Sequence, residues 1–200
     1  GRNAYAGFVD VELRPVKQLL LGGAARYDHY HDFGGKATWR ATARFDATKG
    51  VAVRGTIGTG FKAPSLQQQY FSAVRGATSA GRLVTVGTLP VSDPVAQALG
   101  ATELKAERSR NVSAGVVFGP IGGFSFTADY FHIRIKDRIA LSEQLGGAAV
   151  VAILTEAGIT NFQQVRFFTN AVDTTTKGIE ITGRWQGDIA PDTRLSVMAG

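Results

Sequence analysis

The residues of this chain whose spacing could support chemistry begin with a glycine-rich segment at residues 58–65, GTGFKAPS. Its glycines resemble both a dinucleotide-binding loop and a phosphate-binding loop. A dinucleotide-binding loop needs an acidic residue about 20 positions later, but no Asp or Glu occurs between Asp46 and Asp93. In a phosphate-binding loop Lys follows the last glycine directly, whereas here Phe61 precedes Lys62. We therefore predict no nucleotide cofactor at this segment.

A second candidate is the histidine pair of residues 28–32, DHYHD. In an extended strand His29 and His31 share one face, as two metal ligands must. We interpret the segment instead as a solvated loop after a strand, with aromatic anchors beside it. His132 stands alone and is interpreted as strand surface. We predict no metal site.

No arrangement of catalytic side chains is visible in this sequence. The Gly-x-Ser-x-Gly motif of a serine hydrolase is absent, since residues 76–81 read GATSAG with the wrong spacing. No pair of carboxylates is placed as a glycosidase requires. The chain has no cysteine, which excludes thiol catalysis, disulfides and zinc fingers. We predict that the chain has no catalytic residues and is not an enzyme.

The elements that position these side chains are indicated by alternation of apolar and polar residues. Residues 36–46 alternate without an error, with Ala37, Trp39 and Phe45 among those on one face and Lys36 and Asp46 among those on the other. Alternation is the pattern of an amphipathic strand, and this segment has about the length of a tilted membrane strand. Mean hydropathy is +0.00, and no apolar run is long enough for a membrane helix.

Seven further segments alternate less cleanly: residues 8–13, 19–28, 51–57, 111–118, 124–130, 179–185 and 194–199. The sequence therefore predicts eight long strands. The phase changes once, at residues 131–136, where apolar residues occupy the face that was polar before. Either a bulge or a strand that extends beyond the bilayer would explain this change.

The connections between the predicted strands alternate in length. Short turns are expected at residues 14–17, 47–50, 119–123 and 187–192, and longer segments at residues 28–35, 62–103 and 137–164. Residues 95–99 and 148–157 carry the signals of short helices inside two of the long segments. Short turns on one side and long loops on the other are typical of an antiparallel transmembrane β-barrel, with periplasmic turns and extracellular loops. We predict this all-β fold.

The basic residues favour no nucleic-acid partner, although the net charge is +6 and the isoelectric point about 9.8. They are spread at alternate strand positions, whereas a nucleic-acid surface gathers them in a patch. Arg40, Arg44 and Arg54 would point into a barrel lumen. They would line a passage for anionic solutes or pair with acidic residues of a plug. We take these three as candidate lumen or substrate contacts.

Two alternatives remain open at this point. A soluble β-sandwich or adhesin-like binding module would use the same alternation to build a core between two sheets. An outer-membrane barrel with enzyme activity would need a nucleophile motif that the sequence lacks.

Several blocks of the chain resemble the barrel signature of TonB-dependent outer-membrane receptors. The most specific is RGTIGTGFKAPSLQQQYF at residues 54–71, where a strand ends in a Gly-Phe-x-Ala-Pro-Ser-Leu run. Four more blocks follow the order of the family: residues 26–38, 98–116, 126–139 and 167–182. One departure is Ala106, which stands where the family usually has Pro.

The resemblance implies that residues 1–200 are a partial barrel domain, about eight strands of a 22-stranded barrel whose lumen is plugged. The signal peptide and the plug domain with its TonB-contacting segment would lie outside the chain. The implied function is active uptake of a scarce bulky nutrient, such as a ferric siderophore or cobalamin, across the outer membrane of a Gram-negative bacterium. The implied partners are the TonB–ExbB–ExbD complex, outer-membrane lipid and a small nutrient ligand. Lys62, Ala63 and Pro64 would set the exit from strand to loop.

Overall fold

The computed structural model describes residues 2–79 and 81–200, and it divides into two compact units. The first contains Gly1–Phe61, Ser109–Ile135 and Thr175–Gly200, and the second contains Lys62–Arg108 and Lys136–Thr174. Several strands run through both units, and each unit is described by itself below.

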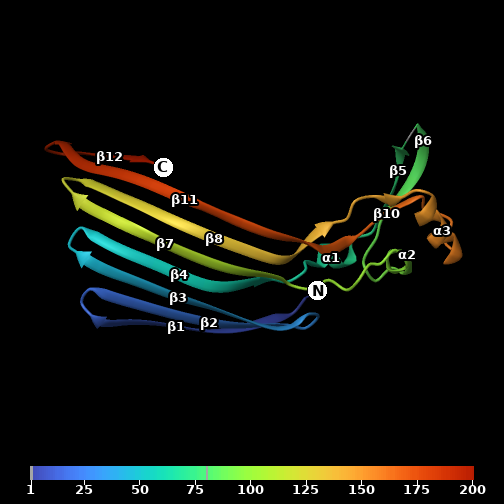
Figure 1. The fold of residues 1–200 in the computed structure, drawn as a ribbon, viewed down its shortest axis with the longest axis horizontal. Coiled ribbons are helices and arrows are strands. Elements are labelled where there is room, and N and C mark those ends of the chain that lie inside the picture. The colour runs from blue at the N-terminus through green and yellow to red at the C-terminus, as the bar shows by residue number, and fades with distance from the viewer. Residues whose placement is uncertain (1, 80) are drawn as a thin grey trace. The chain divides into compact units, whose positions relative to one another are not determined.

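The eight predicted strands form one sheet in the order β1-β2-β3-β4-β7-β8-β11-β12 (Figure 1). The bounds are β1 Ala4–Val16, β2 Leu19–Tyr30, β3 Gly34–Thr48, β4 Val51–Lys62, β7 Glu107–Ile121, β8 Phe124–Leu141, β11 Phe168–Ala190 and β12 Thr193–Ala199. Strands β1 to β4 pair antiparallel in sequence, and β11 pairs antiparallel with β12. The strands are longer than the alternation alone indicated, because pairing extends past the last alternating residue.

The register gives the sheet one apolar and one polar face. Leu21 lies opposite Ala43 and Ala25 opposite Trp39, while Arg26 lies opposite Thr38 on the other side. A slip of one residue would exchange the faces, so the alternation specifies the register. The apolar face stays exposed: 58% for Val9, 48% for Trp39 and 53% for Ile181. In a β-sandwich such residues would be buried against a second sheet, which argues against that alternative.

Four connections at one end of the sheet are two-residue turns. They occupy residues 17–18, 49–50, 122–123 and 191–192. The last three lie inside the predicted short-turn segments, and the first overlaps its predicted segment, 14–17, by one residue. The predicted longer segment at residues 28–35 is wrong in length. Only residues 31–33 lie outside the strands, because the ladder continues until Tyr30 pairs with Gly34. Asp32 is held by Arg2, whose Nη2 lies 2.7 Å from Oδ2.

The phase change at residues 131–136 could reflect either a bulge or a longer strand, and β8 shows a longer strand. It is continuous from Phe124 to Leu141, so the strand extends while the character of its two faces exchanges. Phe131 packs where a Cβ at Gly178 of β11 would stand, which leaves the opposite face of β8 to His132 and Arg134.

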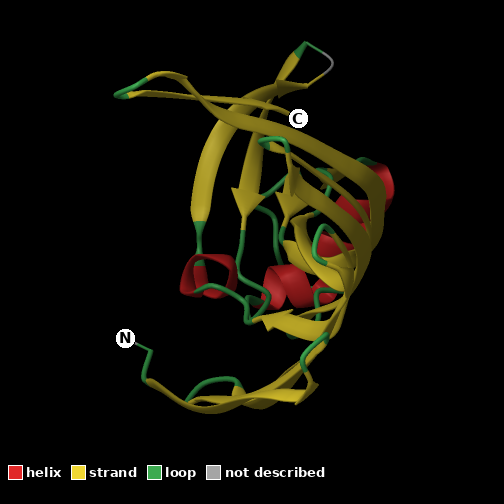
Figure 2. Cartoon of the chain, turned by 90° about the vertical axis from the view of Figure 1, so that its left-hand side faces the viewer, coloured by secondary structure: helices red, strands yellow, loops and turns green. Residues whose placement is uncertain are grey.

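The two longest connections, residues 63–106 and 142–167, carry structure of their own. Their elements are α1 Leu66–Tyr70, β5 Ala73–Ser79, β6 Arg82–Thr88, α2 Pro94–Ala98, β9 Leu145–Gly146, α3 Ala148–Glu156 and β10 Gln164–Arg166. Strands β5-β6-β10-β9 form a second sheet, in which β6 and β10 run parallel. Helices α2 and α3, in red in Figure 2, confirm the two predicted helices. Helix α1 and the β5–β6 hairpin were not predicted.

A signal for α1 is nevertheless present in the sequence. Ser65 accepts a hydrogen bond from the backbone of Gln68, and the Gln68 side chain accepts one from the backbone of Ser65. This arrangement is a capping box, and the spacing Ser-x-x-Gln predicts it from the sequence.

A hydrophobic core holds the second unit together. Leu89, Ala96, Leu154, Val165 and Phe167 are buried in one cluster that both long connections supply. Burying these side chains stabilises the unit by removing apolar surface from water. The connections are therefore folded against each other rather than independent. Among the described residues no helix has the length and hydropathy to cross a membrane.

Residues 1–200 expressed alone are expected to aggregate in buffer without detergent. Within the described residues β1 and β12 each have a single neighbour in the sheet, and open edges beside an exposed apolar face promote association. Size-exclusion chromatography measures this directly. A cooperatively unfolding, detergent-free monomer would contradict the expectation.

Leu154→Ala in the full-length protein is expected to destabilise the second unit by about 2–5 kcal/mol, as cavities in cores do. Limited proteolysis should then cut within residues 142–167 faster than in the wild type. Ile153→Ala is the matched control, because Ile153 is 44% exposed on the same helix. Equal proteolysis of both variants would show that the cluster is not a stabilising core.

Candidate functional site

The three arginines predicted as site residues lie on the polar face of the sheet. Arg40 and Arg44 belong to β3 and Arg54 to β4. Arg44 and Arg54 are direct cross-strand partners, whereas Arg40 faces Gly58. Like charges directly opposite each other are destabilising, so this stretch of the face needs nearby anions.

Those anions come from the strands themselves. Nη2 of Arg40 lies 3.7 Å from Oδ2 of Asp10, and Nη2 of Arg44 lies 2.8 Å from Oδ1 of Asp46. The alternatives from sequence were a passage for anionic solutes or pairing with a plug. In the structure the first partners of all three arginines are carboxylates of the sheet.

Arg54 has the tightest of the three pairs. Its Nε donates to Oδ1 of Asp129 at 2.9 Å and its Nη2 to Oδ2 at 2.5 Å. A Cβ at Gly115 would collide with the same carboxylate, so glycine leaves the space that Asp129 occupies. This two-point geometry fixes both side chains and uses up both carboxylate oxygens.

Two further pairs extend the same pattern across the polar face. Arg26 binds Asp28 through Nε and Nη2, at 2.8 and 2.7 Å, and Arg194 binds Asp188 at 3.0 Å. Asp28 is buried, and burying a charge is costly unless it is paired. Within the described residues, five arginines of the polar face are therefore paired with carboxylates of the sheet.

Another polar cluster lies in the second unit, where β7 begins. The Asn170 side chain donates to the carbonyl groups of Lys105 and Asp137, at 2.9 and 2.6 Å, and accepts from the Lys105 amide. Buried Glu107 accepts from the Ile139 amide at 3.2 Å. These bonds tie three strands together where the ladder begins.

Lys62 ends β4 with Nζ 3.4 Å from Oε1 of Glu107. This contact links the last residue of β4 to the first residue of β7. Sequence reasoning noted the block that contains Glu107 but did not single out this carboxylate, because its partners are distant in sequence.

The histidine pair does not form a metal centre with its neighbours. His29 stacks on Tyr5 with ring centroids 4.8 Å apart. Among the described residues no group of three or more His, Cys, Asp or Glu side chains is placed to hold a metal ion.

An open hollow of about 800 Å³ lies over strands β1 to β3. Gly7, Ala25 and Ala37 leave the space, and Tyr5, Tyr27 and Trp39 are also part of its lining. These six residues belong to the apolar face, and the hollow forms where their small side chains lie between the large ones. Arg26 and Thr38 of the polar face also line the hollow, so it is not confined to the apolar face.

One exposed apolar face, one ion-paired polar face, and turns and long connections at opposite ends define a segment of a transmembrane β-barrel. The chain belongs to the TonB-dependent receptor family, since the family model "TonB dependent receptor-like, beta-barrel" matches residues 1–200. It is accordingly placed in the outer membrane of Gram-negative bacteria, and its family consists of transporters rather than enzymes.

Several known proteins are similar to the chain. The iron-regulated outer membrane virulence protein of Vibrio cholerae is 25% identical over 135 residues, which is 68% of this chain and 18% of that protein. The siderophore receptor PirA of Pseudomonas aeruginosa matches with a TM-score of 0.68 at 20% identity, over 99% of this chain and 34% of PirA. A mutant of the ferric enterobactin receptor PfeA of P. aeruginosa, in complex with enterobactin, matches with a TM-score of 0.69 at 18% identity, over 98% of this chain and 26% of that receptor. The chain thus spans about a third or less of the length of these relatives.

A double-mutant cycle on Arg54→Gln and Asp129→Asn in the full-length receptor tests the tightest ion pair. Because both side chains retain solvent contact, we expect a coupling of about 0.2–1 kcal/mol, the range of exposed pairs. Chemical unfolding in detergent of the wild type, both single variants and the double variant supplies the four free energies. Strictly additive effects would mean that the two side chains do not interact.

Proposed function

We propose that this chain is part of the barrel wall of a transporter that takes up a ferric siderophore, cobalamin or a chelate of similar size. The proposal is carried by the family match over the whole chain. It is supported by the structural similarity to proteins described as siderophore and ferric enterobactin receptors. In such a barrel the polar face of the sheet is the lumen face, since lipid-facing residues are apolar.

The energy for uptake would come from the TonB–ExbB–ExbD complex, acting through a plug domain that is not part of residues 1–200. The ion pairs of the polar face are compatible with a barrel lumen that holds a plug domain. Their side chains are already compensated, so a hydrated lumen does not depend on a plug to neutralise them. Solvent contact of the pairs leaves the face open to a polar cargo.

Among the predicted site residues, Arg40 is the best suited to contact an anionic cargo. Its side chain and that of its partner Asp10 are 60% and 57% exposed, and the pair is long at 3.7 Å. Guanidinium carries five donors, and this loose pair leaves most of them available. Arg54, by contrast, donates two hydrogen bonds to Asp129, and we assign it a structural role.

Uptake of radioactive iron as a siderophore complex tests the function in cells that express the full-length receptor. We expect uptake that requires the receptor gene and TonB, and that stops when an uncoupler dissipates the proton gradient. Uptake that persists without TonB would contradict the transport mechanism. Heat-modifiable migration of the receptor on gels checks that the barrel is assembled.

Arg40→Gln is expected to raise the cargo concentration needed for half-maximal uptake several-fold, with unchanged receptor level, because a lost charged contact costs about 1 kcal/mol or more. Arg194→Gln is a matched control, since Arg194 lies on the same face and pairs with Asp188 near a turn. Unchanged uptake by the Arg40, Arg44 and Arg54 triple Gln variant would refute the cargo contact and leave the transport proposal standing.

A further inference from the structure

The apolar face of the first unit ends in a group of basic side chains on three neighbouring strands. Arg110 lies on β7, His132 and Arg134 on β8, and Lys177 on β11. We call these four residues the basic patch. Strands β7, β8 and β11 are consecutive in the sheet.

The arginines of the patch lie opposite each other. Gly115 of β7 faces Asp129 of β8, because a Cβ at Gly115 would meet that carboxylate. Counting five positions along each antiparallel strand brings Arg110 opposite Arg134. An odd number of positions also changes the face, so both arginines lie on the side away from Asp129, which is the apolar face.

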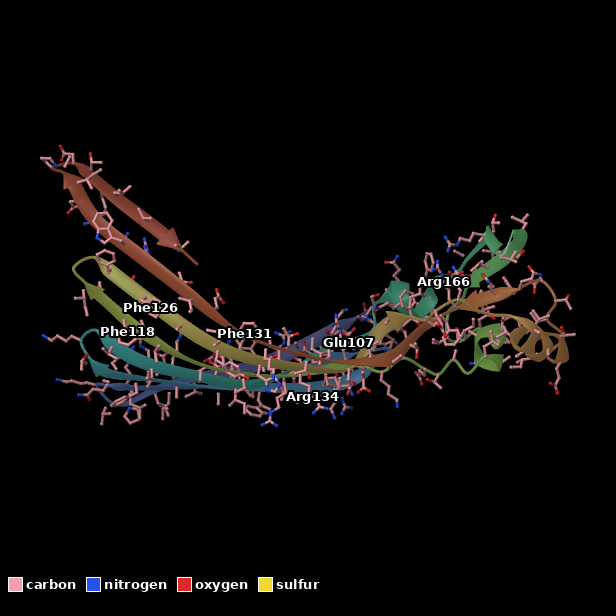
Figure 3. The ribbon with its side chains drawn as sticks, turned by 45° about the horizontal axis from the view of Figure 1, so that its top comes forward. Glu107, Phe118, Phe126, Phe131, Arg134 and Arg166 are labelled. Atoms are coloured by element: carbon pink, nitrogen blue, oxygen red, sulfur yellow. The ribbon has the colours of Figure 1, made fainter. Side chains whose placement is uncertain are left out.

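The lysine joins them from the next strand. Gly178 of β11 faces Phe131 of β8, so Lys177 lies opposite His132 and diagonal to Arg134. Cβ atoms are about 5 Å apart in direct pairs and about 7 Å in diagonal ones. Figure 3 labels Phe131 and Arg134, which belong to opposite faces of β8.

None of these four side chains makes an ion pair or a side-chain hydrogen bond with the described residues. Arg110, Arg134 and Lys177 are exposed. The acidic residues of this unit on β8 and β11 are on the polar face. Asp129 binds Arg54, Asp188 binds Arg194, and the negative charge of Glu180 attracts the Arg54 guanidinium. The charges of the patch therefore need an anion from outside this part of the chain.

The position of the patch indicates where that anion resides. On β11 the apolar-face residues between it and the turn run from Ile179 to Ile189. At about 3.3 Å per residue and a tilt of about 45°, this stretch rises roughly 23 Å. That is close to the apolar band of an outer-membrane barrel, about 25 Å tall. Tyr130, a residue type typical of the interface, lies beside this boundary.

We propose that the basic patch binds the phosphate groups of lipid headgroups in the outer leaflet of the outer membrane. The patch lies at the strand ends joined by long connections, which in such barrels face the cell exterior. Paired guanidinium groups are well matched to phosphate oxygens. Lipid acyl chains would lie along the apolar face beside it. This inference rests on the outer-membrane location and does not depend on the identity of the cargo.

The test uses the full-length receptor, delipidated in neutral detergent, and diphosphoryl lipid A as the probe. Native mass spectrometry at increasing lipid concentration measures the affinity. The variant Arg110→Gln, Arg134→Gln, Lys177→Gln should bind roughly a hundredfold more weakly, since each basic residue near a lipid surface contributes a factor of about five. Heat-modifiable migration verifies assembly of each variant.

The matched control is Arg14→Gln, Lys17→Gln, Lys49→Gln, which removes the same charge at the end with the short turns. It should bind as the wild type does. Equal binding by the patch variant, equal binding of dephosphorylated lipid, or displacement by an equimolar amount of inorganic phosphate would each overturn the proposal. If the triple variant fails to assemble, Arg134→Gln alone should lose several-fold in affinity, and an unchanged value would again overturn it.

Discussion

The rest of this structure depends on the pairing register of one long antiparallel sheet. In hydrocarbon every backbone amide and carbonyl must find a partner within the protein, so the strands have to stay in continuous register. The side chains alternate between faces along each strand, and the same register therefore keeps apolar groups on one face and charges on the other. A slip of one residue, which would part Ala25 from Trp39, would turn the side chains of one of these two strands over and place its arginines on the apolar face.

Electrostatics differ between the two faces. On the polar face the described arginines of β2, β3 and β4 each have a carboxylate partner within the sheet, which reconciles dense charge with a single folded state. On the apolar face the cations Arg110, Arg134 and Lys177 gather beyond the apolar band, and none of them forms an ion pair with the described residues. Compensation within the chain suits a hydrated lumen, whereas uncompensated cations suit a surface that already carries anions.

The long connections form a compact unit with its own core. Leu154 from one connection and Ala96 from the other are fully buried in the same cluster, and the parallel pairing of β6 with β10 adds backbone bonds between the two connections. Loops that bury apolar side chains against each other present a defined surface. For a receptor that must recognise a cargo, such loops reduce the ordering entropy that binding would otherwise cost.

The sequence by itself determined the eight strands, the approximate places of the four short turns and helices α2 and α3, because period-two alternation, turn residues and caps are local signals. The family was also readable from blocks such as residues 54–71, whose residue types recur at fixed spacing. Only the tertiary structure decided which carboxylate each arginine meets. Arg54 and Asp129 are 75 positions apart, and strand order alone brings them together. The core around Leu154, the hydrogen bonds of Asn170 and the opposition of Arg110 to Arg134 likewise join residues that are far apart in the sequence. Alternation indicates which face of a strand a residue occupies, but which residue of another element it meets is decided only when the sheet and the connections fold together.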